Sequence, residues 1–117
     1  METVHIHVAP LTDVLTEDDA AIGGVYQTRV PKGPPGTMAG QALDAFHDSY
    51  GIEELDNFDI RVFTGMPEGA VPTSIAALGT EIVQDEQYPE GEWSGEVEKI
   101  ADSTPLESLS DKGSPHL

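Results

Sequence analysis

The sequence predicts an α+β fold: a small mixed or antiparallel sheet with one main helix packed on it. Two observations support this prediction. Segments at 3–8, 25–30 and 58–63 alternate apolar and polar residues, which is the pattern of half-buried strands. Residues 37–50 instead repeat apolar residues at helical spacing. A helix layer against a sheet layer lets each element bury its apolar side.

The first strand, at 3–8, carries its apolar residues on one face and His5 and His7 on the other. We expect the two histidines to face solvent, because an antiparallel sheet commonly keeps one face wet. A short helical turn is expected at 16–22, where a cap-like threonine precedes several acids. The second strand then follows at 25–30.

The main helix is predicted at about 37–50. Thr37 is a suitable N-cap, and Gly51 is a suitable residue just beyond the C-terminal end. The preceding segment, 31–36, is rich in proline and glycine and is expected to be a loop. Gly40 weakens the first turn by about 1 kcal/mol relative to alanine.

The C-terminal part is expected to be mostly strands. A strand at 58–63 is followed by a helical turn at 74–78 and by strands at 81–84 and 93–100. Residues 102–117 are rich in Ser, Pro and Asp and have no periodic apolar face. Such a composition does not offset its ordering entropy. The sequence therefore predicts one acidic α+β domain at 1–101 and a disordered tail at 102–117.

Charge is the strongest feature of the composition. The 117 residues include 22 acids against 5 Lys and Arg, for a formal net charge of −17. This balance excludes direct electrostatic binding of nucleic acid and attraction to anionic membranes. No apolar run is long enough for a transmembrane helix, and no signal peptide is visible, so a cytoplasmic protein is expected. The absence of cysteine excludes disulfides and thiolate chemistry.

No motif assigns catalytic residues, a metal or a cofactor. His5 and His7 share a strand face and could hold Zn²⁺ with His47 or an acid as a third ligand, but such spacing arises often by chance. Asp44 and His47 are three residues apart on the helix and could form a pair without a nucleophile beside it. The glycine-rich loop at 31–36 lacks both phosphate-binding fingerprints.

The charge itself suggests a function, namely mimicry of nucleic acid. A folded surface rich in carboxylates resembles the phosphate array of DNA and could block a basic nucleic-acid-binding protein. Phage and plasmid inhibitors of restriction or CRISPR systems use this device as a class, and the chain resembles them in size and charge only. An anti-restriction or anti-CRISPR type of inhibitor is thus the leading hypothesis, with a basic nucleic-acid-binding protein as its partner.

The expected partner-binding residues form two acid clusters with aromatic anchors in the second. The first surrounds the main helix and its exit, and consists of Asp44, Asp48, Glu53, Glu54, Asp56 and Asp59. The second consists of Tyr88, Glu90, Glu92, Trp93, Glu96 and Glu98. The aromatic residues would supply the buried hot spot that charged contacts alone rarely provide.

Two alternatives remain open at this point. The acidity could be an adaptation to high salt, in which case it says nothing about a role. The chain could also be a small metal-binding or enzymatic domain that uses His5, His7 and His47. Loss of the fold at low salt would indicate the first alternative, and stoichiometric zinc the second.

Overall fold

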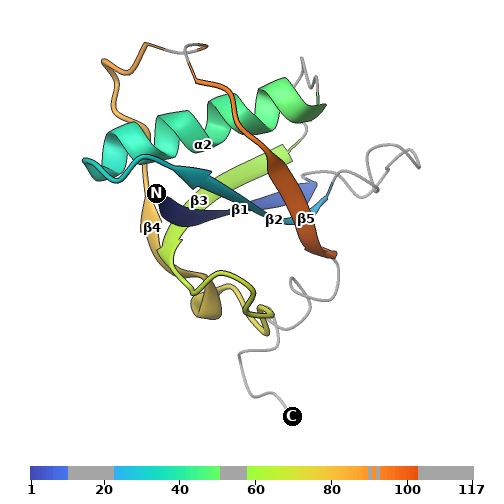
Figure 1. Ribbon diagram of the computed structural model, residues 1–117. Coiled ribbons are helices and arrows are strands. Elements are labelled where there is room, and N and C mark those ends of the chain that lie inside the picture. The colour runs from blue at the N-terminus through green and yellow to red at the C-terminus, as the bar shows by residue number, and fades with distance from the viewer. Residues whose placement is uncertain (11–22, 51–57, 90, 92, 103–117) are drawn as a thin grey trace.

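A computed structural model describes residues 1–10, 23–50, 58–89, 91 and 93–102. These residues form one antiparallel sheet with the strand order β4-β3-β1-β2-β5. The strands are β1 (Glu2–Pro10), β2 (Gly24–Val30), β3 (Phe58–Gly65), β4 (Gly79–Ile82) and β5 (Val97–Asp102). One helix, α2 (Pro35–Tyr50), lies across one face of the sheet (Figure 1). The predicted α+β fold with one main helix is confirmed.

Strand β1 is the centre of the sheet and pairs with β2 on one side and β3 on the other. Val4, Ile6 and Val8 are fully buried and belong to the core cluster that includes residues of α2. The alternation in the sequence therefore identified the helix-facing side of this strand correctly. Small residues on α2, including Ala39 and Ala42, are also fully buried, and they let the helix lie close to the sheet.

The helix begins two residues earlier than the capping pattern predicted. The backbone N–H groups of Thr37 and Met38 both donate to the carbonyl of Pro34, at 3.0 Å each. Pro35 occupies the first helical position, where a missing N–H costs nothing and the fixed φ of proline suits the helix. The end of the expected 31–36 loop is thus the start of the helix.

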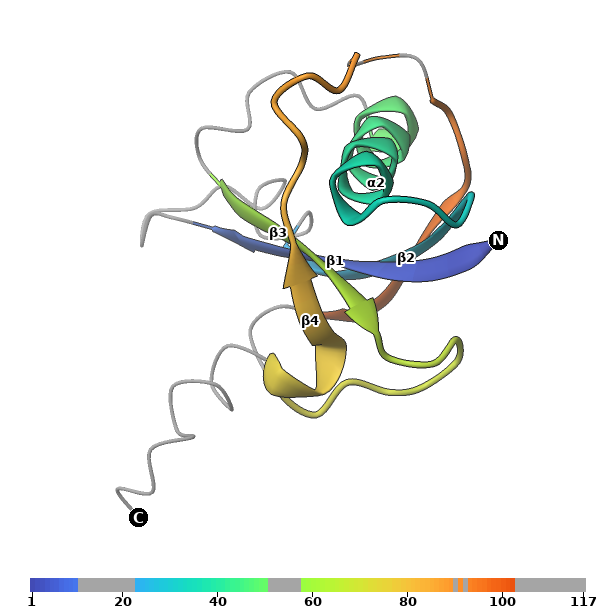
Figure 2. The same ribbon diagram turned by 90° about the vertical axis from the view of Figure 1, so that its left-hand side faces the viewer.

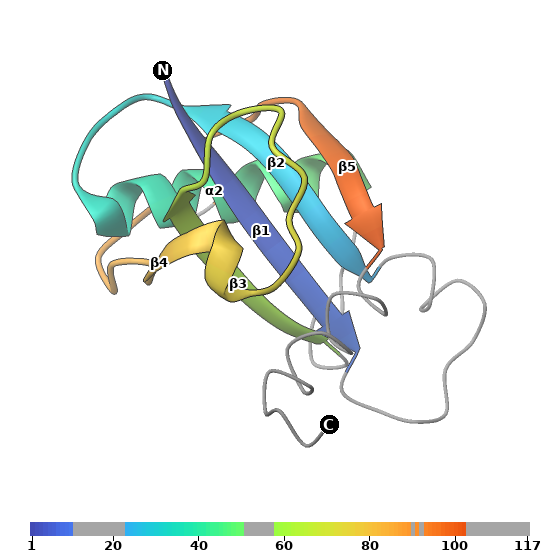
Figure 3. The same cartoon turned by 90° about the horizontal axis from the view of Figure 1, so that it is seen from below.

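The second face of the sheet is covered by the segment between β3 and β4, which includes the 3₁₀ turn η1 (Ala76–Leu78) (Figures 2 and 3). Met66 and Leu78 from this segment pack against Val25 and Phe63 in a second apolar cluster. A helical turn was expected at 74–78, and the observed η1 confirms it.

Covering this face buries both histidines of β1. His5 is 0% exposed and His7 is 2% exposed. The expectation that they face solvent is wrong. An alternating strand shows which residues share a face, but it does not show whether a distant segment covers the polar face.

Residues 83–96 connect the two edge strands, β4 and β5, and are called the crossover segment below. Residues 90 and 92 of this segment are not among the residues that the structure describes. This segment passes over the outer face of α2 (Figures 1 and 2). The amide of Asp85 donates to the carbonyl of Gly36 at 3.2 Å, and the Ser49 hydroxyl donates to the carbonyl of Gly95 at 3.3 Å. The helix is therefore enclosed between the sheet and the crossover segment.

The last two strands differ in position from their expected ranges. β4 occupies Gly79–Ile82 rather than 81–84, and β5 occupies Val97–Asp102 rather than 93–100. The helical turn expected at 16–22 and residues 103–117 of the expected tail lie outside the described residues. Within the part of the chain that the structure describes, no helix has the length and apolar character needed to cross a membrane.

Candidate docking site around Trp93

Asp44 holds the crossover segment against the helix. Its side chain projects from α2 and is only 8% exposed. One carboxylate oxygen accepts a hydrogen bond from the Tyr88 hydroxyl at 2.8 Å and another from the Trp93 amide at 3.3 Å. The other oxygen accepts from the Gly91 amide at 2.9 Å. Asp44 was expected to be an exposed contact acid, and this expectation is corrected: its carboxylate is buried beneath the segment that it fixes.

Gly40 allows the Tyr88 ring to lie directly on the helix. A Cβ atom at position 40 would overlap carbon atoms of that ring. The glycine that weakens the first turn of α2 therefore has a packing role, because no other residue leaves room for Tyr88. Gly40 and Asp44 are one helical turn apart, so they share the face on which the crossover segment rests.

Trp93 lies between two hollows on the surface. The larger, of about 830 Å³, is here called the edge hollow. Thr28 and Val97 are the last residue pair that joins β2 to β5. The edge hollow lies beside the end of β2 that continues past this pair. The smaller, of about 430 Å³, is called the helix hollow and lies between the start of α2 and the crossover segment. Trp93 lines both of them.

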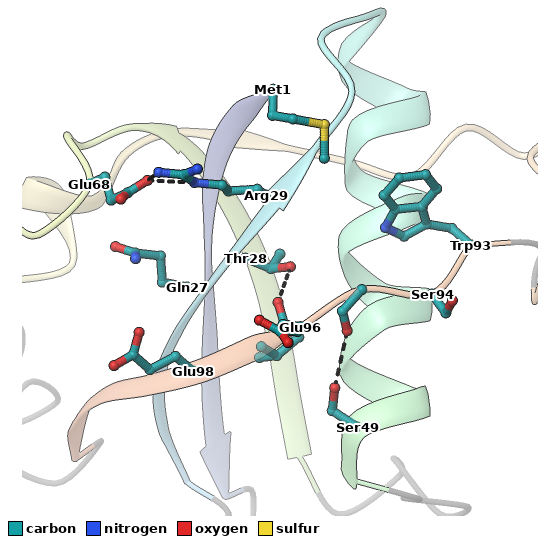
Figure 4. A pocket seen from close by; sticks show the side chains of 12 residues that line it. Met1, Gln27, Thr28, Arg29, Ser49, Glu68, Trp93, Ser94, Glu96 and Glu98 are labelled. Carbon is teal, nitrogen blue, oxygen red and sulfur yellow. Dashed lines mark hydrogen bonds and ion pairs between the residues drawn. The ribbon is translucent and has the colours of Figure 1, made fainter.

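The edge hollow carries three exposed carboxylates. Glu96 and Glu98 come from the crossover segment and β5, and Glu68 comes from the segment that covers the second face. In Figure 4, Trp93 lies beside α2, whereas Glu98 and Glu68 lie on the side of β2 that is away from the helix. The Thr28 hydroxyl donates to the carbonyl of Glu96 at 2.7 Å, which fixes the backbone where the crossover segment enters β5.

Both arginines among the described residues form ion pairs with acids. Arg29 pairs with Glu68 inside the edge hollow, and this hydrogen-bonded pair lowers the pKa of the Glu68 carboxyl. Arg61 pairs with Glu81 at 2.9 Å on the neighbouring strands β3 and β4. Exposed pairs of this kind contribute little to stability. Their effect here is to neutralise the two arginine charges locally, so that the remaining surface acids dominate the field.

The two buried histidines do not form a metal site with His47. His47 lies on α2, which packs on the opposite face of the sheet from His5 and His7. A nitrogen of the His5 ring lies 3.2 Å from the side-chain oxygen of Gln27. Burial lowers the pKa of His5 and of His7, and the charge of Arg61 lowers the pKa of His7 further. Among the described residues no group of His, Cys, Asp or Glu is placed to hold a metal ion.

Apart from the buried Asp44, the predicted contact residues fall into three groups. Asp48, Asp59, Glu96 and Glu98 are exposed, whereas Tyr88 and Trp93 are half-buried. Glu53, Glu54, Asp56, Glu90 and Glu92 lie outside the described residues. The structure brings Trp93, Glu96 and Glu98 together around one hollow.

Sequence reasoning missed two acids of the site. Asp85 lines the helix hollow, and Glu68 lines the edge hollow. Glu68 lies in a turn far from the second acid cluster in the sequence, so no local signal linked it to that cluster. Asp85 follows an expected strand at 81–84, and its position at a chain turn could have suggested a role.

Comparisons with family models, curated proteins and solved structures find no match to this chain.

Proposed function

We propose that this protein is an acidic partner-binding protein that inhibits a basic nucleic-acid-binding protein by occupying its phosphate-binding surface. Inhibitors of the anti-restriction or anti-CRISPR type, encoded by phages or plasmids, act in this way. The observation that carries the proposal is the edge hollow, which the exposed acids Glu96 and Glu98 line together with the half-buried Trp93.

Charge supports this proposal in two ways. The net charge of −17 creates a strong attraction for basic surfaces, which accelerates association at low salt. Ion pairing of Arg29 and Arg61 leaves the two nearby acids Glu96 and Glu98 to present their charge outward. Acids on neighbouring positions of an extended strand are spaced closely enough to contact successive basic side chains.

An aromatic anchor supports the proposal independently of charge. Exposed ion pairs alone give little net affinity, and most protein interfaces depend on a few well-packed anchors such as tryptophan. The backbone amide of Trp93 donates a hydrogen bond to Asp44, so the point of the chain from which the indole projects is held before a partner arrives. Such preorganisation reduces the entropy cost of binding.

The test is a titration with a lysine-rich peptide, followed by fluorescence. Trp93 is the only tryptophan in the chain and therefore reports directly on this site. We expect saturable binding that weakens as salt is added, because salt screens exposed charges. Substituting Glu96→Gln and Glu98→Gln together should weaken binding about tenfold at low salt, since each exposed ion pair contributes up to about 1 kcal/mol.

The matched control is the double variant Asp48→Asn and Asp59→Asn. It removes the same number of charges from two exposed positions of the first predicted cluster. It should retain most of the affinity, because neither residue lines the edge hollow. Equal losses in both double variants would mean that only net charge matters and would overturn the assignment of this site.

A further inference from the structure

The helix hollow on the other side of Trp93 has a different chemistry from the edge hollow. Its lining includes the aromatic residues Tyr88 and Trp93, together with Pro89 and the carboxylate-bearing Asp85. Aromatic faces attract cations through their quadrupole, and a carboxylate beside them supplies a full opposite charge. A hollow of about 430 Å³ has room for one long side chain.

A second carboxylate lies behind the wall of this hollow. Asp44 contacts both Tyr88 and Trp93 through hydrogen bonds. Its three donors, a hydroxyl and two backbone amides, are neutral groups. These hydrogen bonds therefore hold the carboxylate in place without adding positive charge beside it. A buried charge acts through a medium of lower effective dielectric than water, so its attraction extends into the hollow.

Two residues that line the hollow each have a buried polar atom without a hydrogen-bond partner among the described residues: the Trp93 indole N–H, a donor, and the Gln41 side-chain oxygen, an acceptor. Gln41 lines the same hollow as Asp85. Ammonium and guanidinium groups are donors only, so they suit the two acceptors of this hollow, the Gln41 side-chain oxygen and the Asp85 carboxylate.

We propose that the helix hollow is a pocket for one cationic side chain, lysine or arginine, of the basic partner. This inference rests on the proposed function and deepens it. The partner's chain would cross Trp93, with one basic side chain in the helix hollow and others beside the acids of the edge hollow. Asp85 would pair with the cationic head, and the rings of Tyr88 and Trp93 would enclose its stem.

The experiment uses Nα-acetyl-lysine methylamide and Nα-acetyl-arginine methylamide as probes, with the norleucine analogue as the neutral control. The single indole N–H of Trp93 gives one resolved proton signal, whose shift reports on the wall of the hollow. We expect a saturable shift at millimolar concentrations of one or both cationic probes and none with norleucine. Asp85→Asn should weaken this binding about fivefold, because it removes an exposed charge.

Glu86→Gln is the matched control, since it removes the same charge from the next residue, which does not line the hollow. Asn at position 85 also keeps an oxygen that can accept the 2.8 Å hydrogen bond from the Gln87 amide, so the turn is preserved. Glu86→Gln should bind the probes as the unmodified chain does.

Two results would overturn the pocket: no shift with either cationic probe, or equal affinities for the Asp85→Asn and Glu86→Gln variants. Neither result would affect the proposed function if Glu96→Gln with Glu98→Gln still weakened binding of the lysine-rich peptide. The proposed function fails if those two substitutions leave peptide binding unchanged, whatever the small probes do.

Discussion

The Tyr88 hydroxyl donates a hydrogen bond to the buried carboxylate of Asp44 across 44 residues of sequence, at 2.8 Å. This contact joins the main helix to the crossover segment. It places a half-buried aromatic ring beside the helix hollow, and the same carboxylate also fixes the backbone of Trp93. The core of the fold and the proposed docking surface thus share one side chain.

Substituting Asp44→Ala should therefore reduce both stability and binding. It leaves the Tyr88 hydroxyl and two backbone amides without their acceptor, and we expect a loss of about 2–4 kcal/mol in the free energy of unfolding. Urea denaturation measures this loss. The exposed acid Asp48 on the same helix provides the control, and Asp48→Asn should change stability by less than about 0.5 kcal/mol. Similar small effects from both variants would show that the Asp44 contacts do not hold the crossover segment.

Gly40→Ala separates helix propensity from packing. In an ordinary helix this change would stabilise the chain by about 1 kcal/mol. Here the added Cβ would overlap the Tyr88 ring, so we expect destabilisation instead. Thermal unfolding followed by circular dichroism gives the sign directly. A raised melting temperature would mean that Tyr88 does not rest on the helix.

His7 should make the fold sensitive to mild acid. Burial and the charge of Arg61 lower the pKa of His7 from 6.5, against a smaller opposing effect of Asp59. The unfolded chain then binds more protons than the folded chain below about pH 6.5, so the free energy of unfolding falls as the pH drops from there towards the folded pKa. His7→Phe should flatten this dependence, as measured by urea denaturation at a series of pH values. An unchanged slope in that variant would exclude His7 as its source.

Salt dependence distinguishes a docking surface from adaptation to high salt. If the acids serve a partner, the chain should unfold cooperatively in about 0.1 M KCl and become moderately more stable near 1 M, as screening reduces self-repulsion. Circular dichroism melting at the two concentrations tests this. A chain that is unfolded at the lower concentration and folds only at the higher one would favour the halophilic alternative.

Much of the fold could be predicted because it depends on local patterns. The alternation of Val4, Ile6 and Val8 and the apolar stripe around Phe46 each identify a buried face without knowledge of the rest of the chain. The burial of His5 and His7 was not predictable in this way. It depends on Met66 and Leu78, which approach the second face of the sheet from a segment with no regular pattern.

The candidate site was predicted only in part for the same reason. Trp93, Glu96 and Glu98 are close in sequence, so their grouping could be inferred from spacing along an extended segment. Asp44 resembles any other helix acid, and its burial depends on donors from residues more than forty positions away. Glu68 reaches the edge hollow only through the path of the segment after β3.

The central claim, that this surface displaces nucleic acid from a basic protein, is best tested by competition. The intact chain would first be used as bait to capture its partner from a lysate. The purified partner would then be bound to fluorescent duplex DNA, and the chain would be titrated in while the anisotropy of the DNA is measured. We predict that DNA is released by the chain and by the Asp48→Asn, Asp59→Asn variant, and much less by the Glu96→Gln, Glu98→Gln variant. DNA that stays bound at saturating chain, or equal release by both variants, would contradict the claim.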